Sequence, residues 1–170
     1  TENGGHFAFS TGRNRFDTER VLPMWKDICN MPCIFCNGSM LYDPKTGETI
    51  DPVYILPEEK AAEIFRFVRD NFSAVAGARA TTPRGFLFAD DDEFVRKRFT
   101  ENGNIHVSEV LPIEKIDGRE LFKIVVETTP EHREEIFEAM HAYFGDILDD
   151  GAPIDDGMIT VFKAPNSYTG

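Results

Sequence analysis

The chain has 170 residues, of which 41% are hydrophobic, and its 30 acidic and 18 basic side chains give a formal net charge of −12. This charge argues against nucleic acid or an anionic membrane surface as the main partner, because either would require a basic face. No apolar stretch approaches the roughly 20 residues of a membrane-spanning helix. We therefore expect a cytoplasmic protein that acts on a small molecule.

The first predicted elements form a β-α-β unit. Short apolar runs at 6–10 and 33–36 each end in small polar residues and glycine, as buried parallel strands do where they reach a site. Between them, residues 14–30 have apolar side chains at roughly helical spacing, and Pro23 predicts a kink. We therefore expect two adjacent parallel strands whose C-terminal ends share a cleft, since ligands collect there in open α/β sheets.

A hairpin and a helix follow. Residues 44–47 (Pro-Lys-Thr-Gly) are a turn signal between strands expected at 40–43 and 48–56. Pro57 then opens an amphipathic helix. Its apolar stripe consists of Ala61, Ile64, Phe65, Val68 and Phe72.

The rest of the chain has the element order of an α+β layer. We predict a strand-rich stretch broken at 83–85, then a strand, a second amphipathic helix and a final strand, at 73–89, 121–127, 129–145 and 158–162. The charged segment 90–98 has no predicted structure. This order is typical of helices on one face of an antiparallel sheet. The sequence therefore predicts the α/β class, with a partial Rossmann-like β-α-β core over residues 1–55 and an α+β layer over residues 56–170.

The ends of the first two strands hold candidate phosphate-binding residues: Thr11, Gly12, Arg13, Asn37 and Gly38. A threonine hydroxyl can donate to an anion, a glycine lets backbone amides approach closely, and an arginine supplies a permanent charge. Asn-Gly on the neighbouring strand end is expected to line the same cleft, although it is also a common turn dipeptide. An ordinary strand-to-helix turn with an exposed arginine is the alternative interpretation of the first three residues.

The run Phe9–Arg13, followed by Asn37–Gly38 and the strand Leu41–Asp43, resembles the haloacid dehalogenase-like (HAD) hydrolases, specifically the Cof-type phosphatases. It is similar to the second motif of that family and to the strand and hairpin after it, and the rest of the chain has the order of the large α/β cap. The resemblance implies a Mg²⁺-dependent phosphatase of small phosphorylated metabolites, such as sugar phosphates. In that family an Asp attacks phosphorus to give an aspartyl-phosphate, and the Thr that matches Thr11 binds the transferring phosphoryl group.

Three parts of the family's site are not found in this sequence: the D-x-D nucleophile strand, the Lys and the late acidic metal motif. Asp90–Asp92 imitates a nucleophile strand, but it follows the Thr11 motif instead of preceding it, and we interpret it as a solvated acidic turn. We therefore expect a fragment of a longer protein, with Mg²⁺ ligands outside these residues and no activity by itself. A non-catalytic phosphate-binding or interaction domain is the alternative.

Cys29, Cys33 and Cys36 support a further alternative. Their C-x-x-x-C-x-x-C spacing, with an aromatic residue before the last cysteine, is typical of the four-iron cluster of radical S-adenosylmethionine enzymes. However, the last two cysteines lie in an expected strand, which would point them to opposite faces, and the glycine-rich cofactor strand is missing. We expect reduced, metal-free thiols that act as small buried hydrophobes.

Overall fold

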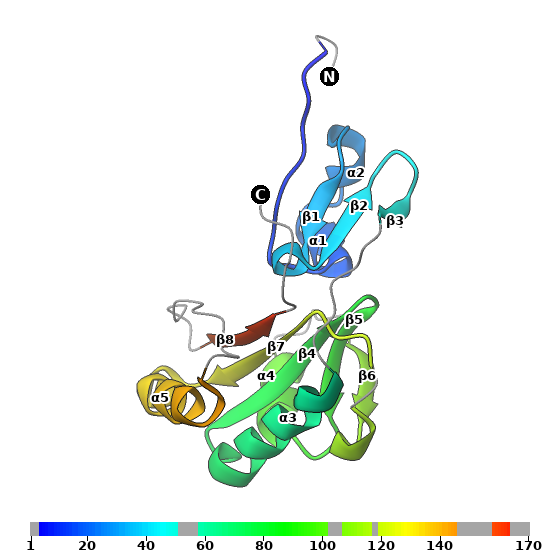
Figure 1. Cartoon of the computed structure of the whole chain (residues 1–170). Helices are drawn as coiled ribbons and strands as arrows, with labels where there is room; N and C mark the ends of the chain where they lie inside the picture. Colours follow the sequence, from blue (N-terminus) through cyan, green and yellow to red (C-terminus); the bar gives the residue numbers. More distant parts are fainter. Residues whose placement is uncertain (1–3, 51–57, 102–106, 117–118, 146–157, 164–170) are drawn as a thin grey trace.

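A computed structural model describes residues 4–50, 58–101, 107–116, 119–145 and 158–163 (Figure 1). It contains a three-stranded sheet of order β1-β2-β3 and a five-stranded sheet of order β6-β5-β4-β7-β8. We refer to described residues 4–50, which hold the first sheet, as the N-terminal unit, and to the described residues from 58 onward as the C-terminal unit. The expected α/β fold class is confirmed. The predicted boundary between residues 55 and 56 lies outside the described residues.

The N-terminal unit is built on an antiparallel meander of β1 (Cys33–Phe35), β2 (Met40–Asp43) and β3 (Glu48–Ile50). The predicted hairpin is confirmed. Its turn closes because the Asp43 carbonyl oxygen accepts from the Gly47 N–H at 2.9 Å, while the Asp43 carboxylate accepts from the Lys45 N–H at 2.8 Å. Gly47 has φ +76°, a conformation that glycine adopts without steric cost. The part of the predicted strand beyond Ile50 lies outside the described residues.

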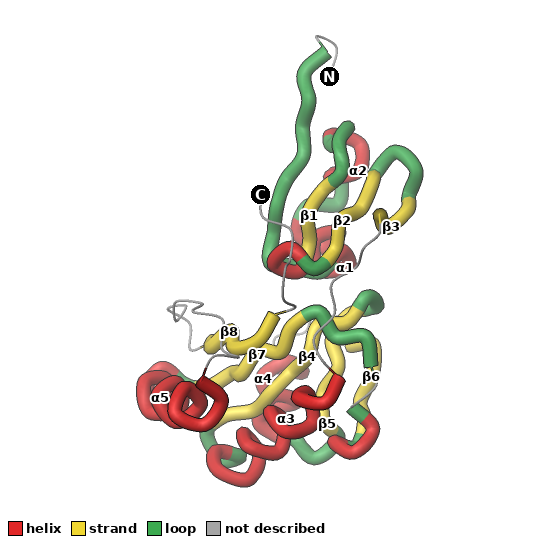
Figure 2. Tube along the Cα trace, viewed as in Figure 1, coloured by secondary structure: helices red, strands yellow, loops and turns green. Residues whose placement is uncertain are grey.

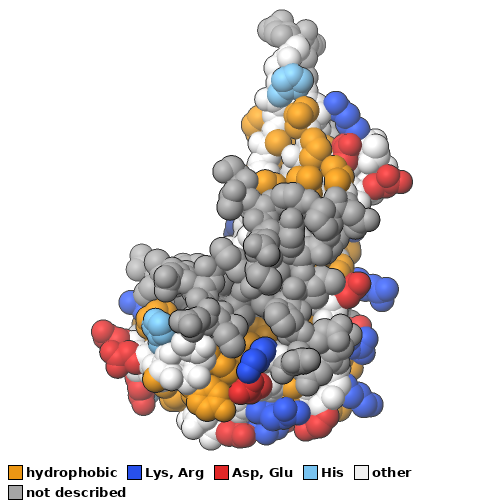
Figure 3. All heavy atoms as spheres, viewed as in Figure 1, with side chains coloured by type: hydrophobic (Ala, Val, Ile, Leu, Met, Phe, Trp, Pro, Cys, Tyr) orange, Lys and Arg blue, Asp and Glu red, His pale blue; other side chains and the backbone are white. Residues whose placement is uncertain are grey.

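The predicted kinked helix is two short helices, α1 (Arg15–Val21) and α2 (Trp25–Ile28), separated around Pro23. Asn14 caps α1, since its Oδ1 accepts from the Asp17 N–H at 2.7 Å. Of the apolar side chains in the expected stripe, only Trp25 is fully buried. Its ring contacts those of Phe9, Phe35 and Tyr42 edge to face. Phe16 is half-buried, whereas the other large apolar side chains from this segment to Met31 are exposed: Val21, Leu22, Met24, Ile28 and Met31. Figure 3 shows hydrophobic side chains on the surface of the N-terminal unit.

The predicted strand at residues 6–10 is wrong in extent. The segment runs beside β1, but its ladder is reduced to one parallel bridge between Ser10 and Ile34. A strand exists only where a partner supplies a ladder, and β1 has three residues whose other edge already pairs with β2. His6, Phe7 and Ala8 are exposed, so only the end of the run is half-buried, through Phe9.

The C-terminal unit is built on the five-stranded sheet. Its strands are antiparallel except for the parallel pair β5–β6. The bounds are β4 (Ala76–Thr82), β5 (Gly85–Ala89), β6 (Val107–Leu111), β7 (Lys123–Thr128) and β8 (Met158–Lys163). The hairpin broken at 83–85, the strand before the second helix and the final strand are therefore confirmed, whereas β6 was not predicted. None of the helices among the described residues is long and apolar enough to span a membrane.

Helices cover both faces of this sheet (Figure 2). Both α3 (Glu58–Phe72) and α5 (Arg133–Phe144) share the larger core with β4, β5 and β7. Residues Ala76, Ala78 and Ala80 of β4 point into that core, so small side chains let the helices approach closely. The predicted stripe of α3 is confirmed, and Gly145, with φ +52°, ends α5 as expected.

The opposite face carries α4 (Glu93–Glu101), which packs its Val95 against Phe86 and Phe88. No structure was predicted for its segment, and helices were expected on one face of the sheet only, so α4 corrects both predictions. Asp92 caps the N-terminus of α4, because its carboxylate accepts from the Val95 N–H at 3.0 Å. The same carboxylate also accepts from the Ala78 N–H of β4 at 2.8 Å. Burial raises the pKa of Asp92, and the two backbone donors oppose this shift. Asp90 and Asp91 are exposed, so the acidic turn is confirmed for them, whereas Asp92 is a partly buried helix cap.

Gly77 is the position at which α4 meets β4, and we predict that Gly77→Ala destabilises the protein by about 1–3 kcal/mol through overpacking. A Cβ at this position would lie 2.3 Å from Oδ1 of Asp92 and 2.4 Å from Cγ2 of Val95. Urea denaturation measures the loss. Ala74→Gly, on the exposed turn before β4, is the control for a change of one methyl group. An unchanged midpoint for Gly77→Ala would contradict this packing.

Candidate functional site

The candidate site lies where the first segment and β1 end. The Thr11 N–H donates to the Ile34 carbonyl oxygen at 3.0 Å, and the Ile34 N–H donates to the Phe9 carbonyl oxygen at 2.9 Å. This ladder is parallel, so both segments deliver their C-terminal ends to the same edge. The predicted adjacency is confirmed: the Asn37 N–H donates to the Thr11 carbonyl oxygen at 3.3 Å. The cleft expected between the two ends stays a prediction.

Thr11, Gly12 and Arg13 form a tight turn before α1. The Thr11 hydroxyl oxygen accepts from the Arg13 N–H at 3.2 Å, which fixes the oxygen and leaves the hydroxyl proton free to donate. The side chain of Arg13 is 55% exposed and its Nε lies 3.4 Å from Oδ2 of Asp17. The same carboxylate binds Arg20 at 2.8 Å. The guanidinium of Arg13 therefore has a carboxylate partner and lies over the first turn of α1.

The turn Cys36–Gly38, which follows β1, has unusual backbone geometry. Cys36, Asn37 and Gly38 have φ of +55°, +58° and +97°. Two consecutive residues other than glycine in the left-handed region store strain, which commonly marks a functional site. The Cys36 N–H donates to the Arg13 carbonyl oxygen at 3.0 Å, so the two turns hold each other. Gly38 is buried and Asn37 is exposed.

Gly12 is required by the closeness of the two turns. A Cβ at this position would lie 2.9 Å from Oδ1 of Asn37 and 3.4 Å from its Cγ and Nδ2. The Asn37 amide therefore packs directly over the Gly12 backbone. The structure thus brings all five predicted residues to one edge, although the arginine turns its charge toward α1.

A sixth residue, which the sequence did not predict, belongs to the site. Lys123, at the start of β7, donates from Nζ to the Gly12 carbonyl oxygen at 2.8 Å and to Oδ1 of Asn37 at 2.7 Å. Burial is the main cause that lowers the pKa of Lys123 to about 8, and the charge of Arg79 adds to it. No local pattern indicates this contact, because a lysine at the start of a strand is common and its partners are far away in the chain.

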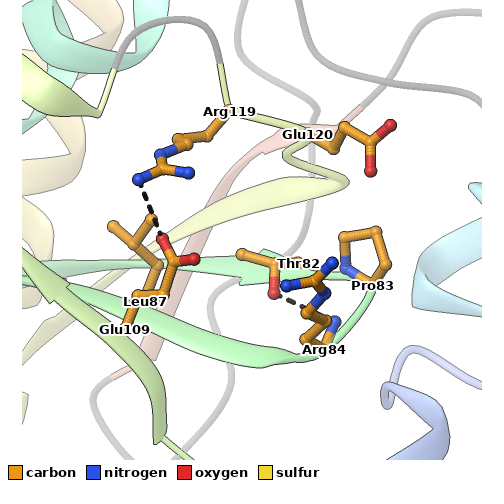
Figure 4. Close-up of a pocket in the computed structure, with 7 residues that line it drawn as sticks. All are labelled: Thr82, Pro83, Arg84, Leu87, Glu109, Arg119 and Glu120. Atoms are coloured by element: carbon orange, nitrogen blue, oxygen red, sulfur yellow. Dashed lines mark hydrogen bonds and ion pairs between the residues drawn. The ribbon is translucent and has the colours of Figure 1, made fainter.

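A separate cavity of about 240 Å³ lies in the C-terminal unit. Figure 4 shows its lining side chains, which come from the β4–β5 hairpin, from β6 and from the segment before β7. Arg119 pairs with Glu109 at 3.5 Å, and among the described residues Arg84 has no carboxylate partner. Thr82, which lines the cavity, points to the face opposite Thr81 and its cross-strand partner Lys123. We therefore do not include this cavity in the candidate phosphate site.

The cysteines differ from the prediction in one respect. Cys33 lies in β1, but Cys36 follows the strand and begins the strained turn, because its φ of +55° ends the extended conformation. All three cysteines are free and lie in one apolar cluster with Trp25. Burial raises the pKa of Cys36 to about 12, and burial together with the Cys33 thiol raises the pKa of Cys29 to about 12. Among the described residues, no group of three or more His, Cys, Asp or Glu side chains is placed to hold a metal ion.

We predict that these thiols bind no iron–sulfur cluster, since packed apolar surroundings disfavour the thiolate that ligates iron. Anaerobic incubation with iron and sulfide, followed by absorbance spectroscopy, is the measurement. The expected spectrum contains only protein absorbance, and a variant with Cys29 replaced by Ser serves as the control. A stoichiometric cluster that this variant loses would support the radical-enzyme alternative.

Comparison with known proteins gives the family and the fold. The family model of haloacid dehalogenase-like hydrolases matches residues 1–166. No curated protein matches the sequence. Among solved structures, TM0651 from Thermotoga maritima is 22% identical with a TM-score of 0.68, over 96% of this chain and 59% of that one. A haloacid dehalogenase-like hydrolase from Bacteroides thetaiotaomicron is 11% identical with a TM-score of 0.71, over 98% and 60%.

The sugar phosphatase BT4131, described as HAD subclass IIB, is 15% identical with a TM-score of 0.67, over 98% of this chain and 59% of that one. The chain thus spans 60% or less of the length of each of these three structures. The resemblance stated from the motifs is confirmed. By its sequence over residues 1–166, the chain belongs to the haloacid dehalogenase-like hydrolases.

Proposed function

We propose that the full-length protein containing this chain is a Mg²⁺-dependent phosphatase of small phosphorylated metabolites, sugar phosphates among them. The observation that carries the proposal is the meeting of the Thr11–Arg13 turn with the Asn37–Gly38 turn at the end of a parallel pair. The family match and the likeness in fold to a sugar phosphatase support it. We further propose that the boundary of the core with the cap lies near residues 55 and 56.

In this proposal the residues of the chain bind and orient the phosphoryl group. The Thr11 hydroxyl donates to a phosphoryl oxygen, and Gly12, which has no side chain, lets the Asn37 amide lie close to Thr11. The exposed Asn37 amide, next to Gly38 in the other turn, donates to another phosphoryl oxygen. Arg13 adds positive potential beside the two turns. The aspartate nucleophile and the Mg²⁺ ligands of the family belong to other parts of the full-length protein.

A phosphatase assay of the full-length protein tests the proposal. Sugar phosphates and nucleotides are supplied with Mg²⁺ and with EDTA, and phosphate release is measured. We expect hydrolysis of at least one phosphomonoester that EDTA abolishes, and no hydrolysis by the 170-residue chain alone. Tight binding of a phosphomonoester without hydrolysis by the full-length protein would instead support a non-catalytic phosphate-binding domain. Activity in the chain alone would require a nucleophile among its own residues.

A further inference from the structure

The backbone of Lys123 is fixed from both units. The N–H of its neighbour Phe122 donates to the Thr81 carbonyl oxygen at 2.8 Å, and the Ser39 hydroxyl donates to the Phe122 carbonyl oxygen at 3.3 Å. The Phe122 ring is buried in the apolar cluster of the N-terminal unit that contains Trp25. The start of β7 therefore joins the two units, and the lysine extends from a rigid point.

The ammonium contacts both turns of the candidate site. It donates to Gly12 and Asn37, which are 111 and 86 residues away in the sequence. Nζ of a lysine has three N–H donors and no acceptor, so it can bind only the oxygen of the Asn37 amide. The Nδ2 group of Asn37, with its two donors, is left to face away from the lysine.

The orientation of this amide matters for an anion. A phosphoryl oxygen only accepts, so an Asn37 side chain that presents Nδ2 attracts it and one that presents Oδ1 repels it. Asn37 is exposed, and its amide would be free to turn without a partner that selects the oxygen. Lys123 selects the orientation in which a donor faces outward.

The surroundings of Lys123 are also suited to an anion. The positive charges that act on it belong to Arg79 on β4 and Arg13 before α1. Each of these has a carboxylate partner, Glu127 for Arg79 and Asp17 for Arg13. Among the described residues, Lys123 itself has no carboxylate partner within ion-pair distance, so its charge is the one available to an anion at this edge. Because the pKa of Lys123 is lowered to about 8, its ammonium is charged at pH 7 and loses its proton at more alkaline pH.

We propose that Lys123 is a positioning residue for the candidate phosphate site. By holding the Gly12 carbonyl and Oδ1 of Asn37, it turns the Asn37 amide so that Nδ2 donates to a phosphoryl oxygen of the substrate beside the Thr11 hydroxyl. This inference rests on the proposed function. It makes the site depend on three segments that are far apart in the sequence: the Thr11 and Asn37 turns supply the donors, and β7 orients one of them.

The test uses the full-length protein, with the inhibition constant Ki of inorganic phosphate as well as KM and kcat. Lys123→Met is expected to raise Ki and KM about tenfold, since it removes a hydrogen bond to a charged group, while kcat changes less. Lys123→Arg restores part of the loss. Lys115→Met, an exposed lysine elsewhere, is the matched control and leaves Ki unchanged.

Two further measurements separate positioning from a purely structural role. Asn37→Ala raises Ki, and Lys123→Met added to it causes no further increase, because the lysine acts through the amide. Ki of the wild type rises as the pH passes above about 8, where Lys123 loses its proton, and Lys123→Met removes this dependence. Additive effects of the two substitutions, or a pH profile that Lys123→Met leaves unchanged, would overturn the proposal.

The outcomes distinguish the inference from the proposed function. An active enzyme whose Ki and pH profile are unchanged in Lys123→Met would overturn the inference and leave the phosphatase intact. A full-length protein that hydrolyses no phosphomonoester would contradict the proposed function. In that case calorimetric titration with inorganic phosphate still decides the role of Lys123: a tenfold weaker affinity in Lys123→Met supports it, and equal affinity overturns it.

Discussion

Thr11→Ala in the full-length protein is expected to lower kcat for phosphomonoester hydrolysis about a hundredfold, which corresponds to about 3 kcal/mol of lost transition-state stabilisation. The hydroxyl oxygen of Thr11 is fixed by the Arg13 N–H, so its proton has a defined direction. As the phosphoryl group transfers, its oxygens interact more strongly with such a donor than they do in the bound substrate. The loss should therefore fall on kcat more than on KM.

Thr11→Ser is the matched control, because serine keeps the hydroxyl and removes only a methyl group. We expect Thr11→Ser to retain most of kcat. Steady-state kinetics of both variants on the same phosphomonoester make the comparison, with urea denaturation to show that both are folded. Equal kcat for the alanine variant and the wild type would exclude Thr11 from the site. Arg13→Ala should have a smaller effect, since its guanidinium already has Asp17 as a partner.

The second large effect concerns a buried ion pair in the C-terminal unit. Glu127→Ala is expected to lower the free energy of unfolding by about 3–5 kcal/mol, because it leaves the buried guanidinium of Arg79 without its carboxylate. The two side chains are 5% and 9% exposed, with Nε of Arg79 2.8 Å from Oε1 of Glu127. The other carboxylate oxygen lies 3.5 Å from Nε of Arg98.

A double variant provides the control for this pair. Replacing Arg79 by Met and Glu127 by Leu removes both charges and keeps apolar volume, so most of the stability should return. Urea denaturation of the wild type, the single variant and the double variant gives the three free energies. A double variant less stable than Glu127→Ala would show that packing around these side chains, including that of Arg79 on the Phe86 ring, outweighs the charge.

Local patterns predicted most elements of the fold. The α3 stripe, the Gly47 turn, the β4–β5 hairpin and the Gly145 helix end each follow from spacing or from a residue with special backbone freedom. Two elements required tertiary information. The parallel pairing of β6 with β5 joins segments that no turn connects, and the charged sequence of α4 has no regular apolar stripe.

The residues of the candidate site also fall into two groups: those that local patterns predicted and one that required tertiary information. Thr11, Gly12 and Asn37 could be chosen because small polar residues after an apolar run indicate a strand end. The length of the first strand could not be predicted, since a ladder depends on its partner. Lys123 could not be predicted either, because its role comes from the meeting of β7 with two turns far away in the sequence.

A crystal structure of the full-length protein with bound tungstate tests most directly whether Thr11 and Asn37 bind the phosphoryl group together. Tungstate has the shape and charge of phosphate and is unambiguous in an electron-density map. We predict a tungstate oxygen within hydrogen-bonding distance of the Thr11 hydroxyl and another near Nδ2 of Asn37, with Lys123 still bound to Oδ1 of Asn37. Tungstate bound at another site, with both side chains free of it, would contradict the account.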